Sequence, residues 1–586
     1  MKSVEKKYIY VFGSNRKFLK LKSYFDENNF ELILVQGTKN DSPNTSKSKE
    51  ELLEDFLLSY KEEYNIIAFI SFGKGSVINN VEVIAEIFEI IKNKFDCKNA
   101  QFIGPSKEGA RIFCNKYLTS KALEDLNIPV PKTLEIFNLL DTNNLENILH
   151  KLTFPVVIKA ENLSGGRGIK YITDKKSFHS SIKKIISLDI KSCVLTEYLK
   201  GVEVTFTVFR LKNNFMRLPA SYKKETTKEM IHPDAKVKIS GIFKEFEEYF
   251  EYVELVMKKY NIFGFFSLQG ILIKKDNEYI VKFLEAAPRL TGSTPIMESS
   301  LIGFNIFETI YKWLSKEEIY FGYEKRLAIQ YSTYIHNGFK TIKKLKKNNF
   351  IIEAKYENLG SMIYSEDKRD RIRISFYLED INTLTEKINI IGNICGNNNY
   401  SQEIIDVLSW FRYNHPNIYN DIPKKLLDGN WGSEAKWEFY LASHIPNIQL
   451  CSAVFGIPKV ENGFILTRTK RGWELPGGHI EENETIKETL NREILEETGF
   501  IVERAILFGY RKIIAHKPLI SKDGKQYPYP ISYIPHFITS SDINLVDYSG
   551  KEVLERRIFL KKDLISHKSH VEEIINISIE NLDRIN

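Results

Sequence analysis

One short acidic segment constrains the fold of this chain more than any other: Gly478–Phe500, with the sequence GHIEENETIKETLNREILEETGF. Thr485 followed three residues later by Glu488 has the spacing of a capping box, so we expect a helix to begin there. Gly499 is the residue type that ends a helix. Three aliphatic residues recur at i, i+4 and i+8 and predict one apolar stripe for a core: Ile486, Leu490 and Ile494.

The same segment gathers carboxylates on one face of the predicted helix. Glu493, Glu496 and Glu497 fall at i, i+3 and i+4, so their side chains converge. Like charges at this spacing repel unless a cation lies between them, and clustered oxygen ligands suit Mg²⁺ or Mn²⁺. A solvated acidic helix is the alternative interpretation. The spacing of the whole segment favours the metal site.

That spacing is Gly, five residues, Glu, seven residues, Arg-Glu, an aliphatic, any residue, Glu-Glu, any residue, Gly, and an aliphatic or aromatic residue. The segment resembles the box of the Nudix hydrolases at every defined position. The resemblance implies that Glu493, Glu496 and Glu497 hold the metal and act in catalysis. It also implies that Arg492 and Glu484 form a structural pair.

The Nudix resemblance further implies a reaction, the attack of water on a nucleoside diphosphate linked to another moiety, X. Glu493 is one candidate for the general base, and Glu552 and Glu555 outside the box are the others. We expect an α/β/α sandwich over residues 446–586. Four aromatic side chains either line the pocket for X or belong to the core: Tyr527, Tyr529, Tyr533 and His536.

A chain of 586 residues is too long for one core, so several domains are expected. The net charge is +7, but 83 basic and 76 acidic residues are interspersed, which argues against a nucleic-acid partner. Five scattered cysteines form no CxxC pair, which suits a reducing cytoplasm. No apolar run approaches a membrane span, so no membrane partner is expected.

The N-terminal part alternates apolar runs with helical segments. Short apolar runs end at turns and read as buried strands, at Tyr8–Phe12, Phe30–Val35, Ile66–Phe72 and Phe102–Gly104. Helical patterns lie between them, near 17–27, 48–62 and 80–95. This alternation predicts a doubly wound parallel sheet over residues 1–112. The loop at 72–76 is either a plain turn or an anion site.

The middle of the chain carries residue types that grip a nucleotide phosphate. The predicted strand FPVVIKA presents Lys159, and the glycine-rich loop Ser164–Ile169 follows it. Glycines let backbone N–H groups approach a phosphate closely. Two later strands, FFSLQGILI and YIVKFLEAAPRLTGS, carry Gln269 and Glu285. Each piece alone is a weak signal, whereas their order and spacing together are specific.

This order resembles the ATP-grasp superfamily over residues 1–320, including its N-terminal preATP-grasp domain. The resemblance implies that Lys116 and Lys159 grip the α- and β-phosphates of ATP and that Glu203 takes the ribose hydroxyls. It implies a lid over the phosphates, made by Ser164, Gly165, Gly166 and Gly168. It implies adenine recognition by the strand end that holds Glu197, Tyr198 and Leu199.

The same resemblance implies that Gln269 and Glu285 carry Mg²⁺ and that Arg289 faces an acyl-phosphate site. Two positions depart from the common pattern. Thr196 stands where an adenine-facing Glu is usual, and Ala287 replaces an Asn ligand in E-x-N-P-R. These departures keep an alternative open, in which the ATP-grasp half senses a nucleotide and regulates the Nudix half without ligating anything.

We therefore predict a multidomain α/β and α+β protein. The expected order is a preATP-grasp domain over 1–112, an ATP-grasp domain over 113–322, a small α/β closing domain over 323–400, a helical connector over 401–445 and the Nudix domain. The expected function is ATP-dependent joining of a carboxylate to an amine through an acyl phosphate, together with Mg²⁺-dependent Nudix hydrolysis. Lys223, Lys224 and His232 either meet an acidic substrate or belong to a solvated loop. The expected partners are small molecules, and the sequence gives no oligomeric state.

Overall fold

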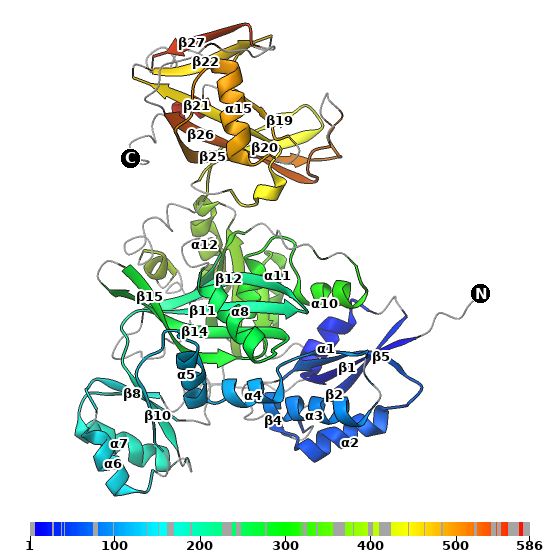
Figure 1. Ribbon diagram of the computed structural model, residues 1–586, viewed down its shortest axis with the longest axis vertical. Coiled ribbons are helices and arrows are strands. Elements are labelled where there is room, and N and C mark those ends of the chain that lie inside the picture. The colour runs from blue at the N-terminus through cyan, green and yellow to red at the C-terminus, as the bar shows by residue number, and fades with distance from the viewer. Residues whose placement is uncertain are drawn as a thin grey trace. The chain divides into compact units, whose positions relative to one another are not determined.

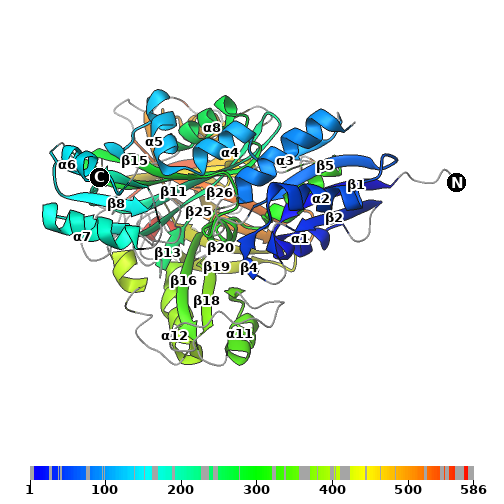
Figure 2. The ribbon, with the colours of Figure 1, turned by 90° about the horizontal axis from the view of Figure 1, so that it is seen from below.

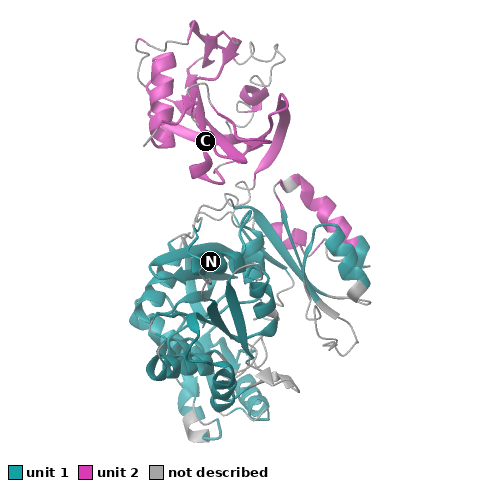
Figure 3. Ribbon diagram, turned by 90° about the vertical axis from the view of Figure 1, so that its right-hand side faces the viewer, with its two compact units in different colours: residues 1–377, 393–397 teal, residues 378–392, 398–586 magenta. Residues whose placement is uncertain are grey.

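The computed structural model divides the chain into two compact units (Figure 3). The N-terminal unit comprises residues 1–377 and 393–397, and the C-terminal unit comprises 378–392 and 398–586. None of the described helices combines the length and apolar character needed to cross a membrane. The structure describes residues 6–25, 29–36, 38–39, 42–73, 80–95, 97, 99–136, 139–150, 152–160, 169–187, 190, 192–225, 237–241, 248–275, 278–317, 319, 325–335, 338–354, 370–378, 380–395, 402, 404–409, 423–442, 445–461, 463–470, 472–481, 484–520, 524, 526–540, 547, 553–560 and 573–577.

The chain begins with a parallel sheet of order β2-β1-β5-β6, which confirms the predicted doubly wound arrangement. Its strands are β1 (Lys7–Gly13), β2 (Phe30–Gln36), β5 (Asn65–Phe72) and β6 (Gln101–Ile103). Helices α2 (Lys49–Ser59) and α3 (Asn80–Lys94) cover one face, and α1 (Asn15–Lys22) covers the other (Figure 1; Figure 2 gives the view from below). The alternating strand side chains explain this, because Tyr10 and Phe12 face α2 and α3 whereas Ile9 and Val11 face α1. A separate hairpin pairs β3 (Thr38–Lys39) with β4 (Ser42–Ser46).

Two further sheets follow in the N-terminal unit. The smaller sheet has the order β7-β10-β8-β9, and α6 and α7 pack on its apolar face. The bounds here are α4 (Lys107–Phe113), α5 (Lys116–Asp125), β7 (Thr133–Ile136), α6 (Thr142–Leu149), β8 (Val156–Ala160), β9 (Ile169–Ile172), α7 (Lys175–Ile186) and β10 (Cys193–Glu197).

The larger sheet has eight strands in the order β15-β14-β11-β12-β13-β16-β18-β17. The region over 323–400, predicted as a small α/β closing domain, continues this sheet, because β16 pairs directly with β13. The bounds are β11 (Val202–Leu211), β12 (Asn214–Glu225), β13 (Val237–Ser240), α8 (Tyr249–Lys259), β14 (Gly264–Lys275), β15 (Glu278–Ala287), α9 (Thr294–Ser299), α10 (Ile306–Leu314), β16 (Leu327–Ile335), α11 (Gly338–Lys347), β17 (Ile351–Ala354), β18 (Asp370–Leu378), η1 (Ile381–Thr383) and α12 (Leu384–Cys395).

The C-terminal unit is built on a mixed sheet of order β19-β20-β25-β26-β21-β22-β23, with β24 paired to β21 and β27 to β22. Helix α15 (Ile486–Thr498) lies across one face (Figure 1), where Leu490 and Ile494 pack on Val454 and Ile465. The bounds are β19 (Lys424–Trp431), β20 (Ala435–Leu441), η2 (Ile448–Leu450), β21 (Ala453–Val460), β22 (Gly463–Thr469), β23 (Gly472–Glu474), β24 (Gly477–His479), β25 (Arg504–Ala515), β26 (Ile531–Ser540) and β27 (Glu555–Phe559).

The prediction of a helical connector over 401–445 was wrong for its second half. Residues 424–441 form the hairpin β19–β20, and β20 pairs along its whole length with β25. The physical reason is the side-chain pattern of β20, where Trp437 and Phe439 are buried in the core of the sheet and polar residues alternate with them. Gly432 turns the hairpin at φ 56°, in the left-handed region that glycine favours.

Candidate functional site

The acidic segment forms the predicted helix, α15. The Thr485 hydroxyl oxygen accepts a hydrogen bond from the Glu488 N–H, and the Glu488 carboxylate accepts one from the Thr485 N–H, which completes the capping box. Gly499 ends the helix at φ 65° and its N–H donates to the Leu495 carbonyl. The sequence prediction of both ends is confirmed.

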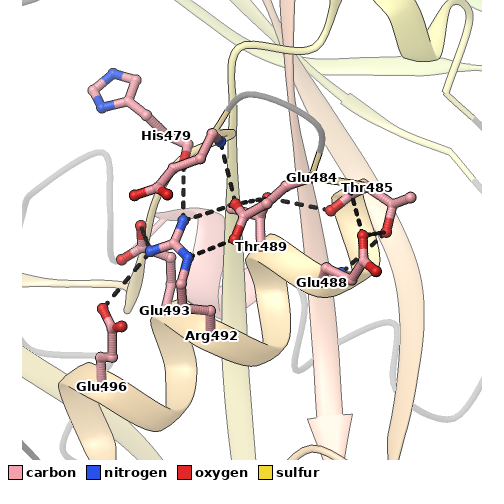
Figure 4. Close-up of polar contacts among 9 residues, drawn as sticks. His479, Glu484, Thr485, Glu488, Thr489, Arg492, Glu493 and Glu496 are labelled. Carbon is pink, nitrogen blue, oxygen red and sulfur yellow. Dashed lines mark hydrogen bonds and ion pairs between the residues drawn. The ribbon is translucent and has the colours of Figure 1, made fainter.

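Arg492 organises the polar contacts around α15 (Figure 4). Its Nε donates to Glu484 Oε1 at 2.7 Å and its Nη2 donates to Glu484 Oε2 at 2.9 Å, so the pair is bidentate. Its Nη1 donates to Glu493 Oε1 at 2.8 Å, and its Nη2 also donates to the His479 carbonyl at 3.2 Å. The bond to Arg492 lowers the pKa of Glu484 to about 2. The predicted Arg492–Glu484 pair is confirmed.

The three clustered carboxylates have different surroundings. The Glu493 side chain is 15% exposed and fits against Gly478, where a Cβ atom would lie 2.3 Å from Glu493 Oε1. Burial raises the pKa of Glu493, and Arg492 opposes that rise. Glu497 Oε2 accepts a hydrogen bond of 3.1 Å from the Gly477 N–H. Glu496 is half exposed, with Oε2 3.7 Å from Arg492 Nη1.

The donor set suits a hard divalent cation, because all three side chains offer only carboxylate oxygens. Glycines at positions 477 and 478 let the strand before α15 approach Glu493 and Glu497 closely. Within the described residues, however, no three carboxylate, histidine or cysteine side chains already converge as a metal site. The carboxylates that would hold Mg²⁺ or Mn²⁺ lie along one helix, α15, and each of them contacts a protein group: Glu493 and Glu496 contact Arg492, and Glu497 contacts the Gly477 N–H.

The other candidate residues of the Nudix site differ in exposure, because Glu555 lies on the surface whereas Tyr533 and His536 are buried. Glu555 on β27 forms an ion pair of 3.2 Å with Arg468, and both side chains are about half exposed to water. Glu552 lies outside the described residues. Tyr533 and His536 are buried, and burial lowers the pKa of His536 to about 3. Tyr527 lies nearer the box, because its hydroxyl contacts His479 Nε2.

The second candidate site lies in the N-terminal unit and centres on Lys159. This residue is on β8 of the small sheet and only 6% exposed. Burial lowers its pKa, and the nearby Lys116 ammonium lowers it further, whereas the carboxylates of Glu285 and Glu203 raise it. Two lysines and two carboxylates from α5, β8, β11 and β15 are therefore within electrostatic reach of one another.

The carboxylate of Glu203 belongs to a buried polar network with Lys223 and Gln269. Glu203 on β11 is 3% exposed, forms an ion pair with Lys223, and accepts a hydrogen bond from Gln269 Nε2. Gln269 on β14 lies directly opposite Glu285 on β15 in the sheet. The sheet register thus brings together the two residues that the ATP-grasp resemblance assigns to Mg²⁺.

The strand end expected to bind adenine is anchored to its neighbours. Glu197 forms an ion pair with Lys282 of β15 and accepts a hydrogen bond of 3.3 Å from the Lys132 N–H. The Tyr198 N–H donates to the Pro155 carbonyl at 3.3 Å. Thr196 is buried on β10, between Thr133 and Val157 of the neighbouring strands.

The remaining predicted residues are placed as follows. Lys116 is the first residue of α5, which Asn115 caps. Arg289 follows β15, and partial burial lowers its pKa while the Glu285 charge opposes this. The loop that holds Ser164, Gly165, Gly166 and Gly168, and most of the loop at 72–76, lie outside the described residues.

Sequence reasoning missed the place of Lys223. The lysine-rich segment after Ala220 suggests a solvated loop, but Lys223 lies on β12 and is buried against Glu203. The available signal was the preceding Tyr222, since aromatic residues are enriched in strands. His232 lies outside the described residues, and the Lys224 side chain is among those not described.

Two family models match the chain. Residues 114–242 match the phosphoribosylglycinamide synthetase ATP-grasp (A) domain, and residues 451–574 match the NUDIX domain. The chain joins an ATP-grasp domain to a NUDIX domain.

Curated relatives resemble the ATP-grasp part. A phosphoribosylamine–glycine ligase of Clostridium acetobutylicum is 30% identical over 172 residues, which cover 28% of this chain and 39% of that protein. A D-alanine–D-alanine ligase of Carboxydothermus hydrogenoformans is 25% identical over 252 residues, which cover 40% of this chain and 75% of that protein. A crystal structure of N5-carboxyaminoimidazole synthetase from Staphylococcus aureus with ADP aligns at 13% identity and a TM-score of 0.49, over 66% of this chain and 98% of that one.

Proposed function

We propose that the ATP-grasp domain is an active ligase that joins a carboxylate to an amine or a similar nucleophile. The observation that supports this most strongly is the cluster around Lys159, where the buried Lys159 and Glu203 lie within electrostatic reach of the partly buried Lys116 and Glu285. A cluster of lysines and carboxylates suits ATP with its cation, because the lysines can hold phosphate oxygens and the carboxylates can hold the metal. On this proposal, Thr196 changes the contacts to the nucleotide and Ala287 changes the contacts to the metal, and neither abolishes activity.

The proposed ligase reaction has two steps, and the charged residues of the cluster have a role in each. The ATP γ-phosphoryl group is transferred to the substrate carboxylate, with release of ADP, and the amine then attacks the acyl carbon and displaces phosphate. Lys116 and Lys159 would hold the phosphates, and Arg289 would stabilise the charge that develops on the acyl phosphate. Gln269 and Glu285 would hold Mg²⁺, which neutralises the phosphate oxygens when bound.

We propose that the NUDIX domain hydrolyses a nucleoside diphosphate linked to another moiety, X. Glu493, Glu496 and Glu497 would hold the divalent cation, which neutralises the phosphates and activates water when bound. Arg492 would keep Glu493 against the Gly478 backbone through its bond of 2.8 Å. The lower exposure of Glu493, 15% against 46% for Glu555, favours Glu493 as the base, because burial suits a general base better than a solvated surface position.

The ligase proposal is tested by ADP release from ATP and Mg²⁺ across pooled carboxylic acids and amines. Release should depend on the acid and should fall by about 100-fold or more in Lys159→Ala, because the phosphates lose a buried cation. Lys170→Ala is the matched control, since Lys170 lies exposed on the adjacent strand β9. It should leave the rate unchanged.

The same assay separates the ligase from a nucleotide sensor. A sensor would bind ATP and gain thermal stability from it, yet no acid–amine pair would release ADP. All assays should include Glu496→Gln, which silences the NUDIX domain. Nucleotide turnover that disappears with Glu496→Gln and persists in Lys159→Ala would exclude the ligase and favour the sensor.

A further inference from the structure

A row of polar side chains crosses the large sheet of the N-terminal unit on one face. Its members lie on the neighbouring strands β14, β11, β12, β13, β16 and β18, and in that order they are Gln269, Glu203, Lys223, Lys238, Gln330 and Arg373. Thr205 of β11 lies opposite both Gln269 of β14 and Ser221 of β12, so these side chains share a face. The polar row thus begins at the candidate ATP site, where Glu203 contacts Lys223 and Gln269.

The strand register places Lys238 directly beyond Lys223. Ser221 of β12 lies opposite Ser240 of β13. Lys223 and Lys238 are two residues from this pair, so they lie on its face, about 5 Å apart at the backbone. Both side chains are buried, at 7% and 6% exposure. Two buried ammonium groups on adjacent strands repel each other, which favours an anion beside them.

Lys238 and Arg373 meet at the exposed Gly292, in the segment that follows β15. The Lys238 Nζ donates to Ser293 Oγ at 3.0 Å and to the Gly292 carbonyl at 3.5 Å. The Arg373 guanidinium lies against Gly292, because a Cβ atom built there would be 3.2 Å from Arg373 Nη2. Gly292 is exposed and Arg373 is half-buried, so a ligand can reach the two cations from solvent. Gly292 is also only three residues after Arg289, the residue that would face the acyl phosphate.

Gln330 shows that this end of the polar row is incomplete in the protein alone. It lies opposite Lys238 and is fully buried, and its Nε2 donates to Ser375 Oγ at 3.2 Å. Its Oε1 is buried with no hydrogen-bond donor in the part of the chain that the structure describes. Buried side-chain oxygens normally have a donor. Ser375 is two residues from Arg373 on β18, so Arg373 shares this face.

We infer that Lys238 and Arg373 bind a carboxylate that does not react, on the acid or on the amine that the ligase joins. The inference rests on the proposed ligase function. A guanidinium offers two parallel N–H groups to the two oxygens of a carboxylate, and the ammonium adds a further charged donor. The reacting end of this substrate would lie at Arg289 and its second charge at Gly292. The substrate is thus a dicarboxylic acid or an amino acid, and the strands beyond β12 select it.

The test uses the full-length protein with ATP and Mg²⁺ and compares compounds that differ in one carboxylate. Succinate with butyrate, and glutarate with valerate, test the acid in the presence of pooled amines. Glycine with methylamine, and L-glutamate with 4-aminobutyrate, test the amine in the presence of pooled carboxylic acids. We expect kcat/KM for ADP release, above that of the pool alone, to favour the member with the extra carboxylate by about 30-fold or more in one arm, as for a desolvated charge pair. That arm identifies which substrate carries the carboxylate.

Variants separate this role from a structural one. Arg373→Met should raise KM for the favoured compound about 10-fold or more and leave kcat within about twofold, because it removes a contact that is equally strong before and during the reaction. Arg373→Lys should keep part of the preference. Lys238→Met should act like Arg373→Met, and the half-buried Arg373 decides the test if the buried change impairs folding. Lys343→Met, on the exposed side of α11, is the matched control and should behave like the wild type.

Two results would overturn the inference. One is a fall in kcat for both members of every pair in Arg373→Met with the preference unchanged, which indicates a structural role. The other is equal use of both members of every pair by the wild type.

Failure of the ligase proposal is recognised independently, as the absence of ADP release above the level without acid and amine in every mixture. Binding then decides the inference. With ADP and Mg²⁺ present, one of the four carboxylate-bearing compounds should raise the unfolding temperature of the wild type more than its partner does, and should not do so in Arg373→Met. Equal shifts within every pair would overturn it.

Discussion

At the scale of single residues, the candidate NUDIX site depends on one arginine that donates hydrogen bonds to two carboxylates. Arg492 binds Glu484 through both carboxylate oxygens and holds Glu493 through its remaining nitrogen. Glu484 therefore positions the guanidinium, and the guanidinium positions the proposed metal ligand. The sequence spacing predicts this pair, because the resemblance to the Nudix box covers both residues.

Glu484→Gln should lower the free energy of unfolding of the C-terminal unit by about 1–3 kcal/mol at pH 7. The folded pKa of Glu484 is about 2, below its ordinary 4.5, so the contribution is full above pH 4.5. It is lost as the pH falls from 4.5 towards 2. Urea unfolding at pH 7, 4.5 and 3 should show the gap between wild type and variant closing with acid. The acid sensitivity that His536 adds cancels, since both proteins keep it.

Glu461→Gln, at an exposed turn, is the control and should leave stability unchanged at every pH. A gap between wild type and Glu484→Gln that stays constant down to pH 3 would contradict the assigned pKa.

Gly478→Ala should lower NUDIX hydrolysis by about 100-fold or more, because the new Cβ would lie 2.3 Å from Glu493 Oε1 and displace that carboxylate. Steady-state hydrolysis and circular dichroism measure activity and folding together. Gly432→Ala is the control, since its Cβ meets no atom within 4 Å and its positive φ adds only local strain. Full activity in Gly478→Ala would show that the position of Glu493 is unimportant.

At the scale of elements, local sequence signals predict the helix that carries the site. The capping box and Gly499 act within a few residues, so they can be read without knowledge of the fold. The hairpin at 424–441 could not be predicted in this way, because its strands are stabilised by pairing with β25, more than 60 residues later. The burial of Lys223 is a similar case, since its carboxylate partner Glu203 lies on another strand.

Thr485→Ala should destabilise the C-terminal unit by about 1 kcal/mol, because the Glu488 N–H loses its acceptor at the helix start. Hydrogen exchange at the first turn of α15 should quicken, whereas exchange at its C-terminal end should change little. Thr485→Ser keeps the hydroxyl and should behave like the wild type. Equal destabilisation by Ser and Ala would mean that the threonine methyl group, and not the cap, stabilises this turn.

At the scale of the whole molecule, the chain forms two compact units with separate cores. Calorimetry should therefore resolve two unfolding transitions. ADP with Mg²⁺ should raise only the transition of the N-terminal unit, by about 2.7 kcal/mol of stability at 100 times the dissociation constant. Lys159→Ala should abolish that shift and Lys170→Ala should retain it. A shift of the C-terminal transition instead would mean that the nucleotide binds elsewhere.

The central claim is that one chain carries two independent phosphate chemistries, and ³¹P NMR of the full-length protein tests it most directly. With ATP, Mg²⁺ and an accepted acid–amine pair, the wild type should form ADP and phosphate; with a nucleoside diphosphate derivative, it should form two monophosphates. Lys159→Ala should lose the first reaction alone, and Glu496→Gln the second alone. Loss of both reactions in Glu496→Gln, or ADP formation that survives Lys159→Ala, would contradict the claim.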